Sequence, residues 1–348
     1  MMEGHCMPLY TAPTVTQTQR NIPAAILLIF VAPLVAEFLL GDISIRLLVA
    51  LIPLAPMYGG GALLIREVVR RTGRGWPSIL VLGAAYALVE EAFTTQSLFN
   101  PDYLHLHMHF LAHAWIPFLH IGAWWTLFML NLHAFWSISV SIALVEALFP
   151  ARAEQPWLGR LGDSVVAVLF LLGCVLGTAI TLKQDRWIAP TSQFLFAALV
   201  ILLLILVAFR LKPAEPGSDP GFVPSPWFTG IITFILGFLV LILPPILNWG
   251  AVAAMLAIDL IFLASIRVLS RRTAWTPLHI LSLAAGGAVA YGTHAFLQPP
   301  VAGGANLVVA RIGNAIFLAA AIEVILIGTR RTARFERASP QPTVPMTP

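Results

Sequence analysis

The chain has 348 residues, of which 59% are hydrophobic and 10% are charged, whereas soluble domains carry about 25% charged residues. This composition excludes a soluble globular protein and indicates a polytopic membrane protein, because about ten spans of roughly 20 residues use nearly the whole length. The net charge of +4 does not indicate nucleic acid, since the basic residues gather at span ends, where anionic lipid headgroups are their expected partners.

The apolar runs predict an all-α transmembrane helical bundle with about ten spans over residues 23–328. Residues 1–22 are polar and are expected to form an N-terminal cytoplasmic tail. The next run is long and carries Glu37 near its end, which favours a retained first span over a cleaved signal. A basic and then disordered C-terminal cytoplasmic tail is expected over 329–348. The predicted spans are 23–40, 46–65, 77–98, 117–148, 164–182, 193–209, 227–247, 250–269, 277–297 and 304–328.

Basic residues follow every second span. They are Arg66, Arg70, Arg71, Arg74, Arg152, Arg160, Arg210, Lys212, Arg267, Arg271, Arg272, Arg330, Arg331, Arg334 and Arg337. The opposite ends carry Arg46, Lys183 and Arg186. Because the cytoplasmic side of a membrane protein retains lysine and arginine, both termini are expected in the cytoplasm. The predicted location is the plasma (cytoplasmic) membrane.

Several ionisable side chains lie within the predicted spans, where a charge costs about 3 kcal/mol on insertion scales. They are Glu37, Glu90, Glu91, His133, Asp259, His294 and Arg311. The predicted topology turns most of them toward the outer face, so we expect a shared hydrated pocket that opens away from the cytoplasm. Three others, Glu146, His279 and Glu323, lie near inner ends, where snorkelling or interfacial side chains are expected.

The span 77–98 carries the adjacent carboxylates Glu90 and Glu91 on its polar side. Two adjacent carboxylates cannot both ionise cheaply in a low dielectric, so at least one is expected to keep its proton, which suits proton exchange. The span 117–148 repeats the pattern with His133 and Ser137 on one face. Arg311 is permanently charged and is expected to pair either with a carboxylate of another span or with an anionic ligand.

The connection after the span 77–98 is rich in histidine: His105, His107, His109 and His113. In an extended segment the first three would share a face, and in a helix His105, His109 and His113 would do so. Either geometry could present imidazoles to a divalent metal such as zinc or to copper. The alternative is an interfacial histidine loop beside the tryptophans that follow.

The primary functional hypothesis is a proton- or metal-linked secondary transporter that uses the seven intramembrane groups. Proline and glycine interrupt the span 46–65, and prolines end the span 227–247. If the chain divides into five plus five spans, these two occupy corresponding positions in oppositely oriented halves. Many transporters expose broken helices to their substrate in such inverted repeats.

Residues 89–93, which contain Glu90 and Glu91, and residues 128–133, which end at His133, resemble the first two motifs of the CPBP intramembrane proteases. The resemblance implies a membrane-embedded, metal-dependent hydrolase in which Glu90 or Glu91 activates water and His133 is its partner. The chain has Thr95 where the family motif has arginine. A third hypothesis is a noncatalytic membrane subunit or a pH or metal sensor, in which the buried charges specify helix packing.

Overall fold

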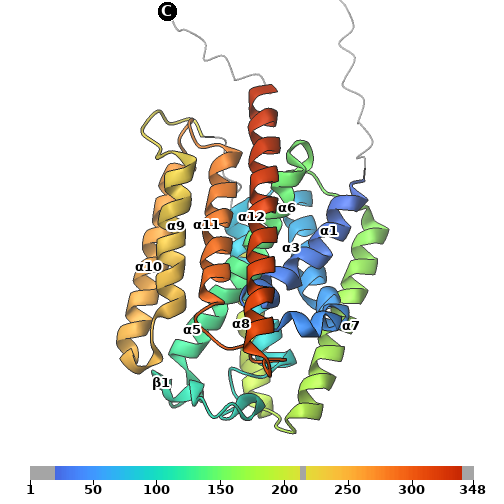
Figure 1. Ribbon diagram of the computed structural model, residues 1–348, viewed down its shortest axis with the longest axis vertical. Coiled ribbons are helices and arrows are strands. Elements are labelled where there is room, and N and C mark those ends of the chain that lie inside the picture. The colour runs from blue at the N-terminus through green and yellow to red at the C-terminus, as the bar shows by residue number, and fades with distance from the viewer. Residues whose placement is uncertain (1–19, 212–216, 339–348) are drawn as a thin grey trace, which may run out of the picture.

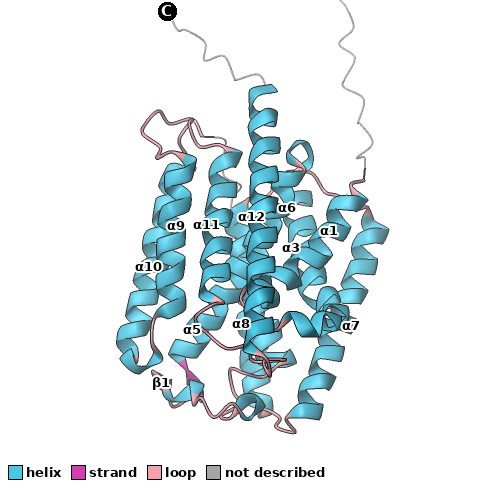
Figure 2. Cartoon of the chain, viewed as in Figure 1, coloured by secondary structure: helices cyan, strands magenta, loops and turns pink. Residues whose placement is uncertain are grey.

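Helices form most of the described chain, which comprises residues 20–211 and 217–338 of the computed structural model (Figures 1 and 2). Most of the expected N-terminal tail and positions 339–348 of the expected C-terminal tail lie outside the described residues. The described sheet is one antiparallel pair, β1 (Trp115–Ile116) with β2 (Ile121–Gly122). β2 occupies the start of the predicted span 117–148, whose helix begins only at Ala123. This architecture confirms the all-α helical bundle.

The first four spans are helices that change type along their length. The first consists of α1 (Ile22–Pro33) and the π-helix η1 (Leu34–Leu39), and the third of α4 (Trp76–Leu88) and the π-helix η4 (Val89–Thr94). The second consists of η2 (Ile45–Ala50), α2 (Leu51–Leu54), the π-helix η3 (Ala55–Gly59) and α3 (Gly60–Arg71). The fourth consists of α5 (Ala123–Asn131), the π-helix η7 (Leu132–Val140) and α6 (Ser141–Leu148). In the first two spans proline explains the change, since it lacks the N–H of a regular turn.

The remaining spans are uninterrupted helices: α7 (Arg160–Gln184), α8 (Thr191–Arg210), α9 (Pro226–Ile242), α10 (Trp249–Leu269), α11 (Pro277–His294) and α12 (Leu307–Ala338). Short helical turns occupy connections: η5 (Tyr103–His105), η6 (Phe110–Ala112), η8 (Pro150–Arg152) and η9 (Pro245–Leu247). The C-terminal tail, expected to be basic from residue 329 and then disordered from residue 332, is helical as far as Ala338, because arginine and alanine are good helix formers and continue α12.

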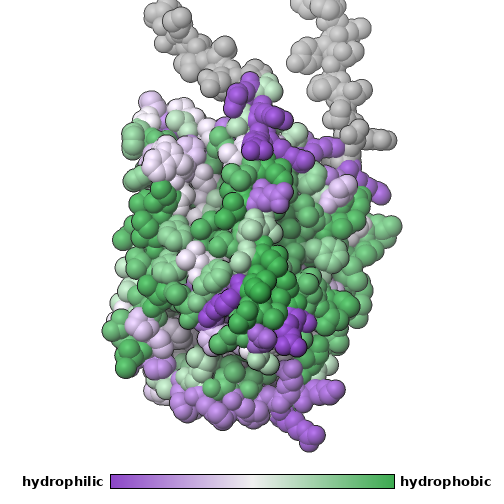
Figure 3. All heavy atoms as spheres, in the orientation of Figure 1, coloured by the Kyte–Doolittle hydropathy of each residue, from purple (hydrophilic) through white to green (hydrophobic). Residues whose placement is uncertain are grey.

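The described helices account for the predicted spans in number and position. Eight of them have the length and hydropathy needed to cross a membrane. Of the other two, α9 is slightly short with 17 residues, and α11 has histidine near both ends. A broad apolar belt covers the middle of the visible face, and the two ends of the molecule are more polar (Figure 3). Such a belt is what a bilayer requires of the surface that it contacts.

The two halves of the chain are not packed alike. The helix of the third span, Trp76–Thr94, has 61% of its apolar window buried, whereas its expected counterpart α10 has 11% buried. Figure 1 accordingly shows α10 at one edge of the bundle, beside α9. These two spans therefore have different surroundings, and the division into five plus five inverted spans stays a prediction.

Two apolar clusters fill the bundle, and η7 contributes to both. Trp136 belongs to the first cluster, where it stacks on Tyr291 with ring centroids 4.8 Å apart and donates to the Gly287 carbonyl at 2.9 Å. Ile138 belongs to the second, which also contains Tyr58 and Tyr86. His133 is the second residue of the same helix, so packing on both sides holds it in place.

Candidate functional site

Each of the four π-helices carries a polar side chain of one buried group. Glu37 lies in η1, Tyr58 in η3, the pair Glu90 and Glu91 in η4, and His133 in η7. A π-helix is uncommon and usually short, and it often marks a functional site because the wider turn re-aims the side chains that follow. Because four spans form π-helices at the residues of one group, this group is the candidate functional site.

The centre of the group is one imidazole between two consecutive carboxylates. His133 Nε2 lies 2.7 Å from Glu91 Oε1, and His133 Nδ1 lies 3.4 Å from Glu90 Oε2. All three side chains are buried. Consecutive residues of a regular α-helix point about 100° apart, and the wide turn of η4 helps both carboxylates to reach the same ring.

The two carboxylates differ in how firmly they are held. Glu91 Oε2 accepts hydrogen bonds from Thr95 Oγ1 at 3.0 Å and from Ser97 Oγ, and Trp125 Nε1 donates to Ser97 Oγ at 3.2 Å. Glu90 Oε2 is buried and makes no hydrogen bond to the described chain. Buried polar atoms are nearly always paired, so Glu90 has the capacity to bind water or a ligand.

Two tyrosines enclose the imidazole. The Tyr58 ring stacks near His133 with centroids 6.0 Å apart, and its hydroxyl donates to Glu37 Oε1 at 2.5 Å. The Tyr86 ring meets His133 edge-on, also at 6.0 Å, and its buried hydroxyl has no hydrogen-bond partner in the described residues. Sequence reasoning missed Tyr58. The available signal was its place between Pro56 and Gly59 in the most interrupted span.

The donor set of this group fits a divalent metal ion. One ligand atom each of Glu90, Glu91 and His133 lies within 4.8 Å of the other two, and no other described residues form such a group. Carboxylate and imidazole are ligands that zinc, manganese and iron accept. The three residues could therefore hold a metal after a small closure of the ligand atoms.

The other intramembrane candidates do not join the group. Asp259, half-exposed on α10, accepts a hydrogen bond from Asn131 Nδ2 at 3.1 Å. The prediction that Arg311 pairs with a carboxylate is wrong for the described chain. The Arg311 guanidinium donates instead to the carbonyls of Ala295 and Gln298, at 2.5 and 2.9 Å. Carbonyls at and beyond the end of α11 lack helical partners and accept such donors. His294 Nδ1 makes no hydrogen bond to described residues.

Arg66 and Arg70, which follow the second span, have partners inside the protein, whereas lipid headgroups as partners of the other arginines at span ends stay a prediction. Glu146 is buried and accepts two hydrogen bonds from Arg70, at 2.9 and 2.6 Å, and lies 3.0 Å from Arg66 Nε. The prediction of a snorkelling Glu146 is therefore wrong. His279 caps α11 together with Thr276, whereas Glu323 is exposed as expected.

The histidine-rich connection is neither extended nor regularly helical. The backbone is left-handed at His105, His107 and His109, with φ of 55°, 53° and 48°, so the segment has neither the extended nor the helical backbone that the two predicted alignments assume. His105 and His107 are exposed beside Asp102. His113 instead meets the Trp124 ring edge-on.

Comparison with known proteins identifies a family. The model of a family described as "Uncharacterized membrane protein family" matches residues 26–337, so the chain belongs to that family. No curated protein and no solved structure matches the chain. The resemblance to the CPBP proteases stays a prediction.

Proposed function

We propose that this member of an uncharacterized membrane protein family is a membrane-embedded hydrolase that cleaves an amide or ester bond of a substrate within the bilayer. One observation carries the proposal: two consecutive glutamates bracket the two ring nitrogens of His133, 2.7 and 3.4 Å away. These are the residues that the CPBP resemblance assigns to a hydrolytic centre. The transport hypothesis has less support, because Asp259 and Arg311 bind other groups.

The three residues suit different roles in activating water. Glu91 is fixed by Thr95 and Ser97, so it can orient the imidazole as a carboxylate orients the histidine of a catalytic triad. Glu90 has a carboxylate oxygen without a hydrogen bond to the described chain, which makes it the general base that accepts a proton from water. As the water oxygen bonds to the carbonyl carbon and the C–N or C–O bond breaks, protonated His133 donates its proton to the leaving nitrogen or oxygen, and the proton on Glu90 then returns to His133.

The surrounding residues suit the same chemistry. The Tyr86 hydroxyl is a buried donor beside the imidazole, and it can hydrogen-bond to the negative charge that develops on a cleaved carbonyl. If Glu90, Glu91 and His133 instead hold a divalent metal, they act as its ligands and not as proton carriers, and the metal would polarise that carbonyl and lower the pKa of its bound water. The site lies among apolar clusters, which exclude bulk water and strengthen each electrostatic contact.

Hydrolysis by the purified protein in proteoliposomes tests the proposal. The substrates are a panel of fluorogenic transmembrane peptides and acyl esters. We expect Glu90→Gln and His133→Ala to lower the rate by about 10²- to 10⁴-fold, the usual contribution of general acid–base groups. Glu323→Gln is the control, because Glu323 is exposed and remote from the group. Each variant is first checked for a monodisperse elution profile.

Two results would contradict the hydrolase. One is hydrolysis at the wild-type rate in both Glu90→Gln and His133→Ala. The other is a proton or metal flux across the vesicle membrane that Glu90→Gln abolishes, with no hydrolysis of any substrate in the panel. The second result would assign the same residues to transport.

A further inference from the structure

An apolar groove lies on the outside of the bundle, against the π-helix η3 that carries Tyr58. The groove has a volume of about 340 Å³ and is lined by residues of α1, α2, η3, α3 and α7. Two of the lining residues, Phe30 and Ile52, are 47% and 72% exposed. Figure 1 shows α7 at the edge of the bundle opposite α10. The groove therefore opens to whatever surrounds the helices.

The depth of the groove brings it into contact with the hydrocarbon of the bilayer. Phe30, Pro56 and Leu169 line it, and each lies near the middle of its membrane-crossing segment. None of the described residues that line the groove carries a polar side chain. A ligand with unpaired amide groups would find no side-chain partner there, which is costly at membrane depth. A hydrocarbon chain has no such groups.

The volume of the groove also distinguishes a lipid chain from a peptide helix. One turn of an α-helix, about 10 Å wide and 5.4 Å long, fills about 420 Å³. This is more than the 340 Å³ of the groove. An extended acyl chain is narrower, because it carries no side chains. The groove therefore suits an acyl chain better than a transmembrane peptide.

Consecutive side-chain contacts link the groove to the buried group around His133. Gly60 lines the groove, and a Cβ on Gly60 would lie 3.1 Å from Phe170 Cβ. The centroid of the Phe170 ring lies 6.1 Å from that of Tyr86, and the Tyr86 centroid lies 6.0 Å from that of His133. A chain in the groove would thus lie two aromatic rings away from the imidazole.

We propose that this groove binds the hydrocarbon chain of the substrate, so that the hydrolase acts on a long-chain acyl ester or acyl amide of the bilayer. This assignment of a substrate class rests on the proposed function. The Phe170 ring is only partly buried, and its rotation lets the ester or amide group reach Tyr86 and Glu90. Water is the co-reactant, and the products are a fatty acid and an alcohol or amine.

Photolabelling tests the groove without any assay of hydrolysis. The probe is a phosphatidylcholine with a diazirine in one acyl chain, mixed into proteoliposomes of the full chain, and the labelled residues are mapped by mass spectrometry. We expect labels on Ala55 and Pro56 in the wild type. Leu169→Trp should remove them, because the larger ring fills the groove. Leu171→Trp is the matched control on the same helix, since Leu171 is 61% exposed and does not line the groove.

Hydrolysis tests the substrate class. The substrates are a palmitoyl ester, a butyryl ester and a transmembrane peptide. Leu169→Trp should raise the KM for the palmitoyl ester about 10- to 100-fold, the usual effect of a misfit in an apolar pocket. The KM for the butyryl ester should stay at the wild-type value, because its chain is too short to fill the groove. Leu171→Trp should leave both KM values unchanged.

Three results would contradict the proposal in different ways. Labels on Ala55 and Pro56 that persist in Leu169→Trp would overturn the groove as the site of the chain. Cleavage of the transmembrane peptide without cleavage of the palmitoyl ester would overturn the substrate class and leave the hydrolase standing. If no substrate is cleaved, the hydrolase and the substrate class both fail, whereas the labelling still decides whether the groove holds an acyl chain.

Discussion

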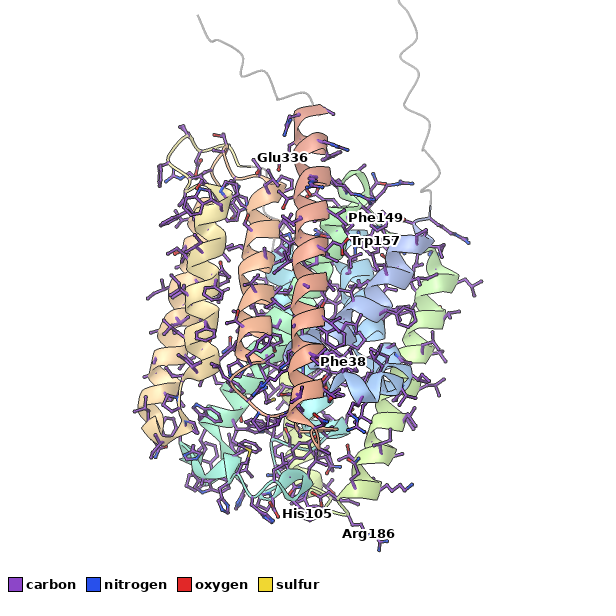
Figure 4. The ribbon with its side chains drawn as sticks, in the orientation of Figure 1. Phe38, His105, Phe149, Trp157, Arg186 and Glu336 are labelled. Atoms are coloured by element: carbon purple, nitrogen blue, oxygen red, sulfur yellow. The ribbon has the colours of Figure 1, made fainter. Side chains whose placement is uncertain are left out.

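Glu67, a buried carboxylate at the basic end of α3, offers the sharpest test of what holds the bundle together. Its side chain is 1% exposed. It accepts hydrogen bonds from the backbone N–H of Trp157, at 2.8 and 3.0 Å, and of Leu158, at 2.9 Å. It also lies 2.7 Å from Arg66 Nη1. Figure 4 labels Trp157 in the segment that these bonds attach to α3.

The expected cost of Glu67→Ala is about 4 kcal/mol of unfolding free energy. Removing one partner of a buried ion pair costs about 3–5 kcal/mol, because the remaining charge is left in a low dielectric. The two backbone donors would also lose their acceptor, at about 1–3 kcal/mol for an unsatisfied buried group. The two costs do not add in full, because Arg66 is not left unpaired: it keeps Glu146 at 3.0 Å and the Trp157 ring at 3.3 Å.

Asp163→Ala is the matched control. Asp163 also pairs with an arginine of α3, Arg71, at 2.6 Å, but the two side chains are 25% and 38% exposed. Exposed pairs contribute about 0–1 kcal/mol. The assay is unfolding by sodium dodecyl sulfate in mixed micelles, followed by tryptophan fluorescence. If Glu67→Ala and Asp163→Ala lower the unfolding free energy by the same amount, burial does not make the Glu67 contacts strong and the reasoning is refuted.

Two further predictions concern backbone packing and pH. A Cβ at Gly59 would lie 2.1 Å from the Ile29 carbonyl oxygen, whereas one at Gly73 would meet no atom within 4 Å. Gly59→Ala should therefore prevent recovery of a monodisperse protein, whereas Gly73→Ala should cost about 1 kcal/mol, for its left-handed φ alone. Asp42 lies in the connection after the first span, where burial and then Glu37 raise its pKa from 3.8 to about 7. The folded state thus binds more protons than the unfolded state between about pH 4 and 7, so stability should fall as the pH rises through this window. Asp42→Asn should flatten this pH dependence in the same unfolding assay, and an unchanged slope would contradict it.

Local sequence was sufficient to predict the class of fold and part of the site. Long apolar runs must form helices in a bilayer, because unpaired backbone groups are too costly there. The same cost made buried ionisable residues conspicuous, and Glu90, Glu91 and His133 do meet. The basic residues alone suggested lipid contacts, yet Arg66 is fully buried, since sequence does not show which end of a helix faces another segment of the chain.

The amino-acid sequence by itself determined that this protein is a helical membrane bundle and which polar residues its spans contain. Only the tertiary structure decided which of those residues meet. Regular helical periodicity assigns each residue to a face of its helix. The wider turns of the four π-helices change the direction of the side chains there, at Glu37, Tyr58, Glu91 and His133. A neighbour from another span is fixed by packing between helices, as the hydrogen bond from Tyr58 to Glu37 shows. No spacing within one span encodes that contact, so the site became visible only when the spans were assembled.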